Sequence, residues 1–210
     1  PYFITRIGTH SFQNSLIKKV YIPKSVISIG KKSFHSCRAL KEIEIEKNSQ
    51  LQIIEKYAFA ESFLISISIP SKVTHILDYA FSNCILHNVN ISQKSQLKEI
   101  GKYAFQNTYI ETIFIPSQIT IMAEGTFYHC ERLEKVKILK DSKLQKIEKQ
   151  AFYNTVIKSL TIPSSVTQLD EGWCDSVYRL NKIEILPQNP KFILFDKKMI
   201  VEKTDIKSDQ

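Results

Sequence analysis

Apolar residues recur along this chain in short alternating runs, and an aromatic residue follows each run. In the unit that ends at Phe81, Ile67 and Ile69 flank Ser68. Alternate residues of a strand point to opposite sides, so this pattern predicts a half-buried strand of about three to five residues. Eight such strands are predicted, centred on Tyr21, Glu44, Ser68, Asn90, Phe114, Lys137, Thr161 and Glu184.

The aromatic residues mark a repeat that runs through most of the chain. Their spacings are 22, 25, 22, 24, 22, 25 and 21 residues. A coil of about 23 residues cannot bury its apolar side alone, so a period in this range predicts coils that stack around one continuous core. The strands should then lie parallel, about 4.8 Å apart. The markers are Phe12, Phe34, Phe59, Phe81, Phe105, Phe127, Phe152 and Trp173.

Short and long units alternate along the repeat, which gives a full period of about 46 residues. The short unit has a proline directly after its strand, as in Ile69-Pro70, whereas the long unit has a polar insert such as Lys47 to Gln50. Proline lacks an N–H donor and fixes its own φ, so strand pairing is expected to end at each of these prolines. The small polar residues after each aromatic residue predict a short helical turn whose aromatic fills the far side of the core.

The string Ile-Pro-x-x-Val-x-x-Ile-Gly-x-x-Ala-Phe-x-x-Cys-x-x-Leu-x-x-Ile-x-Ile resembles the BspA-type, or Treponema-type, leucine-rich repeat over residues 4 to 186. The resemblance implies a leucine-rich-repeat solenoid, a right-handed, gently curved β/α superhelix. About eight coils of 21–25 residues would carry a parallel β-sheet on one face and short helical or 3-10 turns elsewhere. Trp173 in place of Phe and Met122-Ala123-Glu124-Gly125 in place of the Ile-Gly corner depart from the repeat.

The same resemblance carries an expectation about function and location. It implies a bacterial or protist surface protein, at the cell surface or secreted, that serves adhesion. Host extracellular-matrix proteins and other cells would be among its partners.

The repeat stops after Glu184, and the chain divides there into three expected parts. Residues 1–186 form the solenoid, which begins in mid-repeat, so the sequence is expected to be a piece of a longer protein. Residues 187–201 contain a Pro-rich turn and two apolar runs, which predict a β-hairpin that caps the open end of the stack. Residues 202–210 are polar and predicted to be disordered.

The charge of the chain points to a solvated surface more than to a particular partner. Lysine and arginine number 29 against 21 acidic residues, a net charge of +8. The lysines are spread through outward positions, which favours a solvated surface over binding of anionic glycans, and no nucleic-acid-binding module accompanies them. No apolar stretch approaches the ~20 residues of a membrane span, so membrane attachment would need segments outside this sequence.

The cysteines predict no disulfide. Cys37, Cys84 and Cys130 occupy the same position in alternate coils. Such coils lie about 10 Å apart, beyond the ~7 Å limit between the Cα atoms of a disulfide. Buried, inert thiols are therefore expected in this column. Cys174 is offset from it and is expected to be more accessible.

No motif in the chain predicts catalysis, a metal site or a cofactor. A glycine-rich phosphate loop, a His-Glu-x-x-His motif and a Cys-x-x-Cys pair are all missing from the sequence. His35 near Cys37 and His129 beside Cys130 are interpreted as turn residues rather than as metal ligands or nucleophile pairs.

The outward side chains of the strands are the predicted binding surface, because the scaffold fixes them and leaves their identity free to vary. Phe114 is a candidate aromatic anchor, although isolated exposed apolar residues are common. Asn90 also begins a glycosylation sequon, Asn90-Ile91-Ser92. The predicted binding residues are Tyr21, Glu44, Asn90, Phe114, Lys137 and Glu184.

Three functions remain open at this point. The leading hypothesis is a non-enzymatic adhesion or protein-interaction module that binds a protein or glycoprotein through this surface. The alternatives are a structural spacer within a larger surface protein, and a charge-driven binder of anionic glycans.

Overall fold

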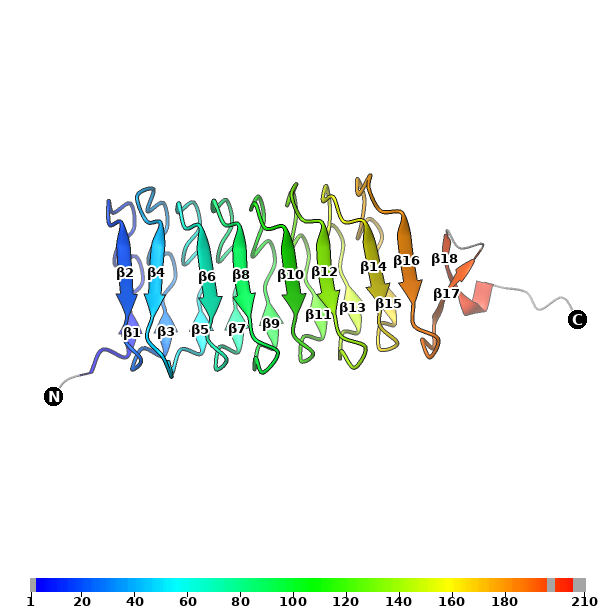
Figure 1. Ribbon diagram of the computed structural model, residues 1–210, viewed down its shortest axis with the longest axis horizontal. Helices are drawn as coiled ribbons and strands as arrows, with labels where there is room; N and C mark the ends of the chain where they lie inside the picture. The colour runs from blue at the N-terminus through cyan, green and yellow to red at the C-terminus, as the bar shows by residue number, and fades with distance from the viewer. Residues whose placement is uncertain (1–2, 196–198, 206–210) are drawn as a thin grey trace, which may run out of the picture.

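The computed structural model describes residues 3–195 and 199–205, which form an elongated stack of coils with the two termini at opposite ends (Figure 1). The predicted four-residue strands make one side of the stack, here called the front sheet. Their position and parallel stacking confirm the prediction from Ile-x-Ile. The strands are β2 (Lys19–Ile22), β4 (Glu42–Ile45), β6 (Ser66–Ile69), β8 (Asn88–Ile91), β10 (Thr112–Ile115), β12 (Lys135–Ile138), β14 (Ser159–Ile162) and β16 (Lys182–Ile185).

A second ladder of parallel two-residue strands lies on the opposite side and is called the back ladder. The sequence predicted a sheet on one face only, because two residues are too few to show an alternation. The ladder is interrupted once, between β9 and β11, where Met122-Ala123-Glu124-Gly125 departs from the repeat. Its strands are β1 (Arg6–Ile7), β3 (Ser28–Ile29), β5 (Ile53–Ile54), β7 (His75–Ile76), β9 (Glu99–Ile100), β11 (Ile121–Met122), β13 (Lys146–Ile147) and β15 (Gln168–Leu169).

The strands of the front sheet come in pairs, as their alternating spacing in Figure 1 shows. β2 pairs with β4, and β6 with β8, over all four residues. No pairing joins β4 to β6 or β8 to β10, all of which lie within the described residues. We call these two gaps the seams.

Proline accounts for the seams. In the paired strands, the N–H of Glu46 donates to the carbonyl of Ile22 just beyond the strands. Pro70 and Pro116 stand at the equivalent positions after β6 and β10 and have no N–H to donate. Between β12 and β14, which Pro163 follows, only Lys135 and Ser159 pair. The expected end of pairing at proline is confirmed.

The corners that follow the back ladder are turns rather than the expected helical turns. Lys32, two residues before Phe34, has a φ of 54°, and such a left-handed residue cannot continue a right-handed helix. Backbone donors then alternate: the N–H of His35 donates to the carbonyl of Lys32, whereas that of Phe34 donates to the carbonyl of Ala58 in the next coil. Bonds between coils thus replace helical ones, and the sole helix among the described residues is the 3-10 turn Lys203–Asp205.

Stacked phenylalanines fill the middle of the core. Each of the six is at most 1% exposed, and successive ring centroids lie 5.2 to 5.8 Å apart in nearly parallel planes. Phe12 continues the stack toward the amino-terminal end, where it is 37% exposed. The six are Phe34, Phe59, Phe81, Phe105, Phe127 and Phe152.

The last coil corrects the predicted register by one residue. β13 pairs with β15 so that Ile147 faces Leu169, which aligns Phe152 with Cys174 rather than with Trp173. The N–H of Phe152 donates to the carbonyl of Trp173, a role that alanine fills in most earlier coils. Trp173 therefore replaces that alanine, and its ring packs edge-on against Phe152 with the centroids 6.3 Å apart.

Three cysteine thiols lie buried beside the aromatic stack, as predicted, and all four cysteines are free. The thiols of Cys84 and Cys130 donate to the carbonyls of Phe59 and Phe105. Burial raises the pKa of Cys84 to about 12 and that of Cys130 to about 11. Cys174 is half-buried and so more accessible than the others, although burial also raises its pKa to about 11.

We expect Cys37, Cys84 and Cys130 to react with a thiol reagent only after unfolding, because the reactive thiolate is both inaccessible and disfavoured by burial. Titration with a chromogenic disulfide should detect at most one native thiol, that of Cys174. A Cys174→Ser variant should remove this signal and leave three thiols that appear in denaturant. Rapid native labelling of that variant would contradict the buried column.

The carboxyl-terminal end carries an antiparallel hairpin of β17 (Phe192–Phe195) and β18 (Met199–Glu202). Residues 196–198, between the two strands, and residues 206–210 of the expected disordered tail lie outside the described residues. Residues 202–205 were also expected in that tail but instead form the end of β18 and the 3-10 turn. They are held there because Lys203 donates its N–H to the carbonyl of Lys191 and its Nζ to that of Asn189.

Candidate binding surface

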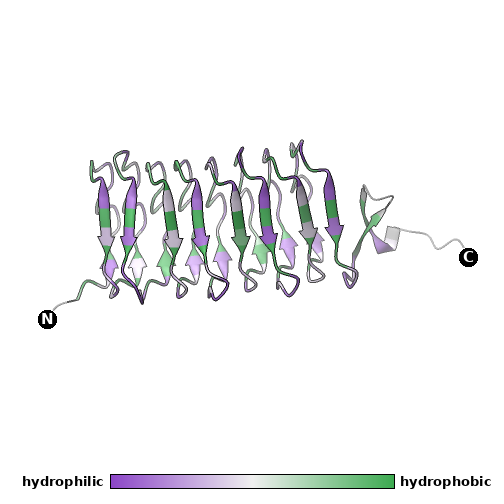
Figure 2. Cartoon of the chain, viewed as in Figure 1, coloured by the Kyte–Doolittle hydropathy of each residue, from purple (hydrophilic) through white to green (hydrophobic). Residues whose placement is uncertain are grey.

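The outward side chains of the front sheet form the candidate binding surface. In β2, Lys19 and Tyr21 are exposed while Val20 and Ile22 are buried. The same alternation recurs in the other front strands, whose hydrophilic and hydrophobic bands Figure 2 shows. Backbone bonds fix the strands, so these side chains project from a rigid base.

The six predicted binding residues share this surface but fall into three separate groups. Tyr21 and Glu44 face each other on β2 and β4 at one end. Glu184 lies on β16 at the other end, where its Oε2 accepts a hydrogen bond from the hydroxyl of Thr161 at 3.3 Å. Asn90, Phe114 and Lys137 lie between these ends, around the β8/β10 seam.

The charged side chains at the amino-terminal end of the front sheet pair with one another. The Nζ of Lys19 lies 3.4 Å from a carboxylate oxygen of both Glu42 and Glu44. Hydrogen bonds to Glu44 and Glu42 raise the pKa of Lys19 above its ordinary value. One cation thus serves two carboxylates, and these three side chains together keep one net negative charge.

The middle group lines a hollow of about 500 Å³. Phe114 is half-buried there rather than fully exposed as expected, and Lys137 stands beside it in register on β12. Asn88 and Thr112 also line the hollow. They were not predicted as binding residues, although they point outward two residues before Asn90 and Phe114 on the same strands, and this position could have identified them. We call this hollow the central groove, lined by Ser68, Asn88, Asn90, Thr112, Phe114 and Lys137.

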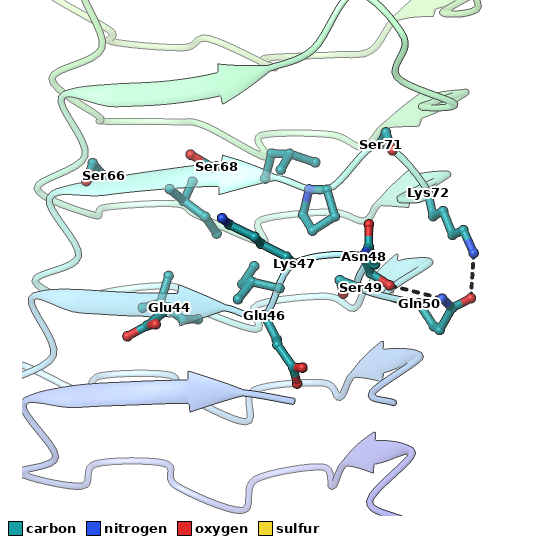
Figure 3. Close-up of a pocket in the computed structure, with 15 residues that line it drawn as sticks. Glu44, Glu46, Lys47, Asn48, Ser49, Gln50, Ser66, Ser68, Ser71 and Lys72 are labelled. Atoms are coloured by element: carbon teal, nitrogen blue, oxygen red, sulfur yellow. Dashed lines mark hydrogen bonds between the residues drawn. The ribbon is translucent and has the colours of Figure 1, made fainter. Parts of the chain in front are cut away.

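A second hollow, of about 610 Å³, lies at the β4/β6 seam (Figure 3). Two of its polar side chains, Gln50 and Glu46, are engaged in hydrogen bonds. Gln50 accepts a hydrogen bond from the Nζ of Lys72 at 2.6 Å and donates one to the carbonyl of Asn48 at 3.0 Å. Glu46 accepts the N–H of Lys24 at 2.8 Å, which lowers the pKa of the carboxyl group. The sequence predicted the break in pairing here but not the hollow that it leaves.

The histidines considered as ligands or catalytic groups lie in turns. Nδ1 of His35 shares a hydrogen bond with the hydroxyl of Ser36, and burial lowers the pKa of the imidazole. Within residues 3–195 and 199–205, no three His, Cys, Asp or Glu side chains gather as a metal site. No helix in that part of the chain has the length and apolar character needed to cross a membrane.

The repeat is shared with a known family of sequences. A family model described as "BspA type Leucine rich repeat region" matches residues 5–84 and 52–181 in six copies. No curated protein matches the chain.

Three solved structures have a similar fold. A leucine rich cell surface protein from Faecalibacterium prausnitzii is 24% identical with a TM-score of 0.58, and the match covers 93% of this chain and 46% of that protein. A leucine-rich repeat protein from Bacteroides ovatus is 21% identical with a TM-score of 0.61, covering 88% and 59%. A leucine rich repeat protein from T. pallidum is 23% identical with a TM-score of 0.62, covering 84% and 72%. The chain thus spans roughly half the length of the first two proteins, and the likeness shows a common solenoid fold.

Proposed function

Because the chain belongs to the BspA-type leucine-rich repeat family, we propose that it is a non-enzymatic module that binds a macromolecular partner across its front sheet. The family implies a role in protein interaction or as a scaffold, and the comparisons indicate no catalytic family. The partner we propose is a host extracellular-matrix or cell-surface protein, bound at the surface of the producing cell. One of the similar structures is that of a cell surface protein.

The front sheet carries this proposal because it presents fixed side chains of mixed chemistry. Aromatic, amide, hydroxyl and ammonium groups stand in register on neighbouring strands. Folding has already ordered the backbone beneath them, so binding need not order it again. A rigid surface of this kind favours recognition of a large partner.

A spacer role is the second candidate, and the shape of the molecule favours it. The stack is elongated, and the chain enters at one end and leaves at the other (Figure 1). Domains attached to the two ends would be held apart by the length of the solenoid. A spacer needs no particular front-face side chain, which makes the two roles separable by mutation.

We expect the triple variant Tyr21→Ser, Phe114→Ser, Lys137→Ser to bind its protein partner about tenfold or more weakly, since central aromatic anchors contribute about 2 kcal/mol or more. The matched control is Tyr178→Ser, Ile121→Ser, Lys31→Ser, whose residues are exposed and lie off the front sheet. Capture of matrix proteins on the immobilised chain, with thermal unfolding as the fold check, compares the variants. Equal capture by both triples, or no capture above an unrelated basic protein, would favour the spacer.

A further inference from the structure

We propose that the central groove binds a linear acidic polysaccharide, with its anionic groups toward β12 and its hydroxyl groups toward β8. This inference rests on the front sheet being the binding face. The groove has a floor and two unlike walls. Phe114 and Thr112 of β10 form the floor, next to the unpaired β8/β10 seam.

The β12 wall is cationic: Lys137 lines the hollow, and Lys135 lies next to it on the same face of β12. Lys135 and Lys137 stand beside Thr112 and Phe114 in register, and both are exposed. Within the described part of the chain, no carboxylate lies within 4 Å of either ammonium group. Glu134, which precedes Lys135, is engaged instead by Lys158, whose Nζ lies 2.8 Å from its Oε2. These two lysines are therefore free to pair with carboxylate or sulfate groups of a ligand.

The β8 wall is neutral and made of amides. Asn88 and Asn90 project from alternate positions of β8. Nδ2 of Asn90 donates to the hydroxyl of Ser68 at 3.3 Å, which orients the side chain and leaves its Oδ1 available. A side-chain amide both donates and accepts hydrogen bonds, as does each hydroxyl group of a sugar.

The floor distinguishes a sugar from an acidic peptide. A peptide usually adds to a sheet by pairing its backbone with an exposed edge. β8 and β10 leave their facing edges unpaired at the seam, but the N–H of Tyr109 donates to the carbonyl of Leu86 at 3.0 Å just before these strands. A peptide strand could therefore enter between them only by separating the two coils. The half-buried ring of Phe114 instead offers an apolar surface flanked by polar groups, the arrangement expected of a pocket for a ring-shaped ligand.

The other hollows fit a sugar less well. The hollow at the β4/β6 seam has no aromatic residue in its lining, and Gln50 engages its Lys72. The hollow beside Tyr109 holds an aromatic ring, but its faces are taken: the ring of His87 lies 5.5 Å away and Arg132 lies 5.1 Å from the ring centroid. Only the central groove combines an aromatic floor with an unengaged cationic wall among the hollows described.

The test measures, by calorimetry, how two acidic probes bind to the whole chain. One is a heparin oligosaccharide of defined length, which carries sulfates, and the other is an alginate oligosaccharide, which carries only carboxylates. Dextran is the neutral probe and poly-L-glutamate the acidic polypeptide. One variant, Lys135→Gln with Lys137→Gln, removes the cationic wall. A second, Asn88→Ala with Asn90→Ala, removes the amide wall without changing charge. The control, Lys31→Gln with Lys98→Gln, removes the same charge from exposed positions off the front sheet.

We expect at least one acidic probe to bind and dextran not to bind. Loss of the charge-assisted hydrogen bonds in the lysine variant should weaken binding about tenfold or more, and loss of the amide bonds should weaken it about tenfold. The control should stay within about twofold, as surface charges off the site contribute little.

Three results would overturn the inference. Equal losses in the lysine variant and the control, with no loss in the asparagine variant, would mean diffuse attraction to a basic surface. Binding of poly-L-glutamate as tight as that of the glycans would assign the groove to an acidic protein segment. If neither acidic probe binds, the groove does not take an acidic glycan. The proposal that the front sheet binds a protein is tested separately, by protein capture on the variant Tyr21→Ser, Phe114→Ser, Lys137→Ser.

Discussion

Phe81→Ala is expected to lower the free energy of unfolding by about 3–5 kcal/mol, the range for deleting a fully buried phenylalanine ring. The ring is 0% exposed and stacks between those of Phe59 and Phe105, with centroids 5.3 and 5.4 Å away. In a solenoid each coil contacts only its neighbours. The cavity therefore weakens the interfaces on both sides of the coil, and the rest of the stack cannot compensate. Denaturant unfolding followed by circular dichroism measures the loss.

Two aromatic residues provide matched controls for this variant. Phe12 occupies the same position in the first coil but is partly exposed and stacks on Phe34 alone, so Phe12→Ala should cost clearly less. Tyr21 is exposed on the front sheet, and Tyr21→Ala should change stability by no more than about 0.5 kcal/mol. Equal unfolding midpoints for Phe81→Ala and the parent protein would refute the stacked core.

The strands and the core were predictable because they follow from local patterns. Ile-x-Ile reports which side of a strand is buried, and Ile69-Pro70 reports where pairing stops. The register of the last coil was not predictable from residue type, because Trp173 looks like the missing aromatic marker. The pairing of β15 with β13 places Trp173 one position before the residue that aligns with Phe152. This register is set by the backbone, and the identity of the side chain does not reveal it.

The corners show a similar limit. Left-handed backbone at Asn83, with a φ of 58°, has a sequence signal, since asparagine tolerates this conformation better than most residues. Tyr57, Tyr79 and Tyr103 adopt it with no such signal, at φ values of 59, 57 and 54°. Their rings stack 4.8 and 5.2 Å apart, which offsets the backbone cost through contacts between coils.

Gly125 takes the next tyrosine position, and a Cβ atom there would lie 2.1 Å from Cε1 of Tyr103. The departure from the repeat at this corner therefore makes room for that ring.

The candidate site was predictable as a face but not as a groove. Alternation places Asn90, Phe114 and Lys137 outward, yet nothing in the sequence indicates that they surround one hollow while Tyr21 and Glu184 lie far from it. That grouping depends on the seam, and the seam depends on how neighbouring coils pair. The half-burial of Phe114 was not predictable either, because the exposure of a strand residue depends on its neighbours in adjacent strands.

Asn189→Ala is expected to lower the free energy of unfolding of the carboxyl-terminal end by about 2–4 kcal/mol, because each buried polar group left without a partner costs about 1–3 kcal/mol. Asn189 is 1% exposed. Its Nδ2 donates to the carbonyls of Pro163 and Val166 at 3.0 and 2.8 Å. Its Oδ1 accepts the N–H groups of Lys191 and Phe192 at 2.9 and 2.7 Å.

One side chain thus joins the preceding short unit to the start of β17, and we propose that it fastens residues 187–201 as a cap on the stack. Earlier long units have a buried serine at this position; in one of them, Ser49 accepts the N–H of Leu51 at 3.1 Å. Asn189→Ser should therefore keep the bond to Lys191 but lose the reach to Pro163 and Val166, and its loss of stability should be intermediate.

Hydrogen exchange of the β17 and β18 amides locates the effect, because the end of a solenoid opens locally before the stack unfolds. We expect those amides to exchange faster in Asn189→Ala while the amides of β6 and β8 stay protected. Uniform exchange throughout the chain would mean that Asn189 supports the whole core instead. Unchanged exchange in the hairpin would show that its attachment does not depend on these four bonds, and the proposed cap would lose its physical basis.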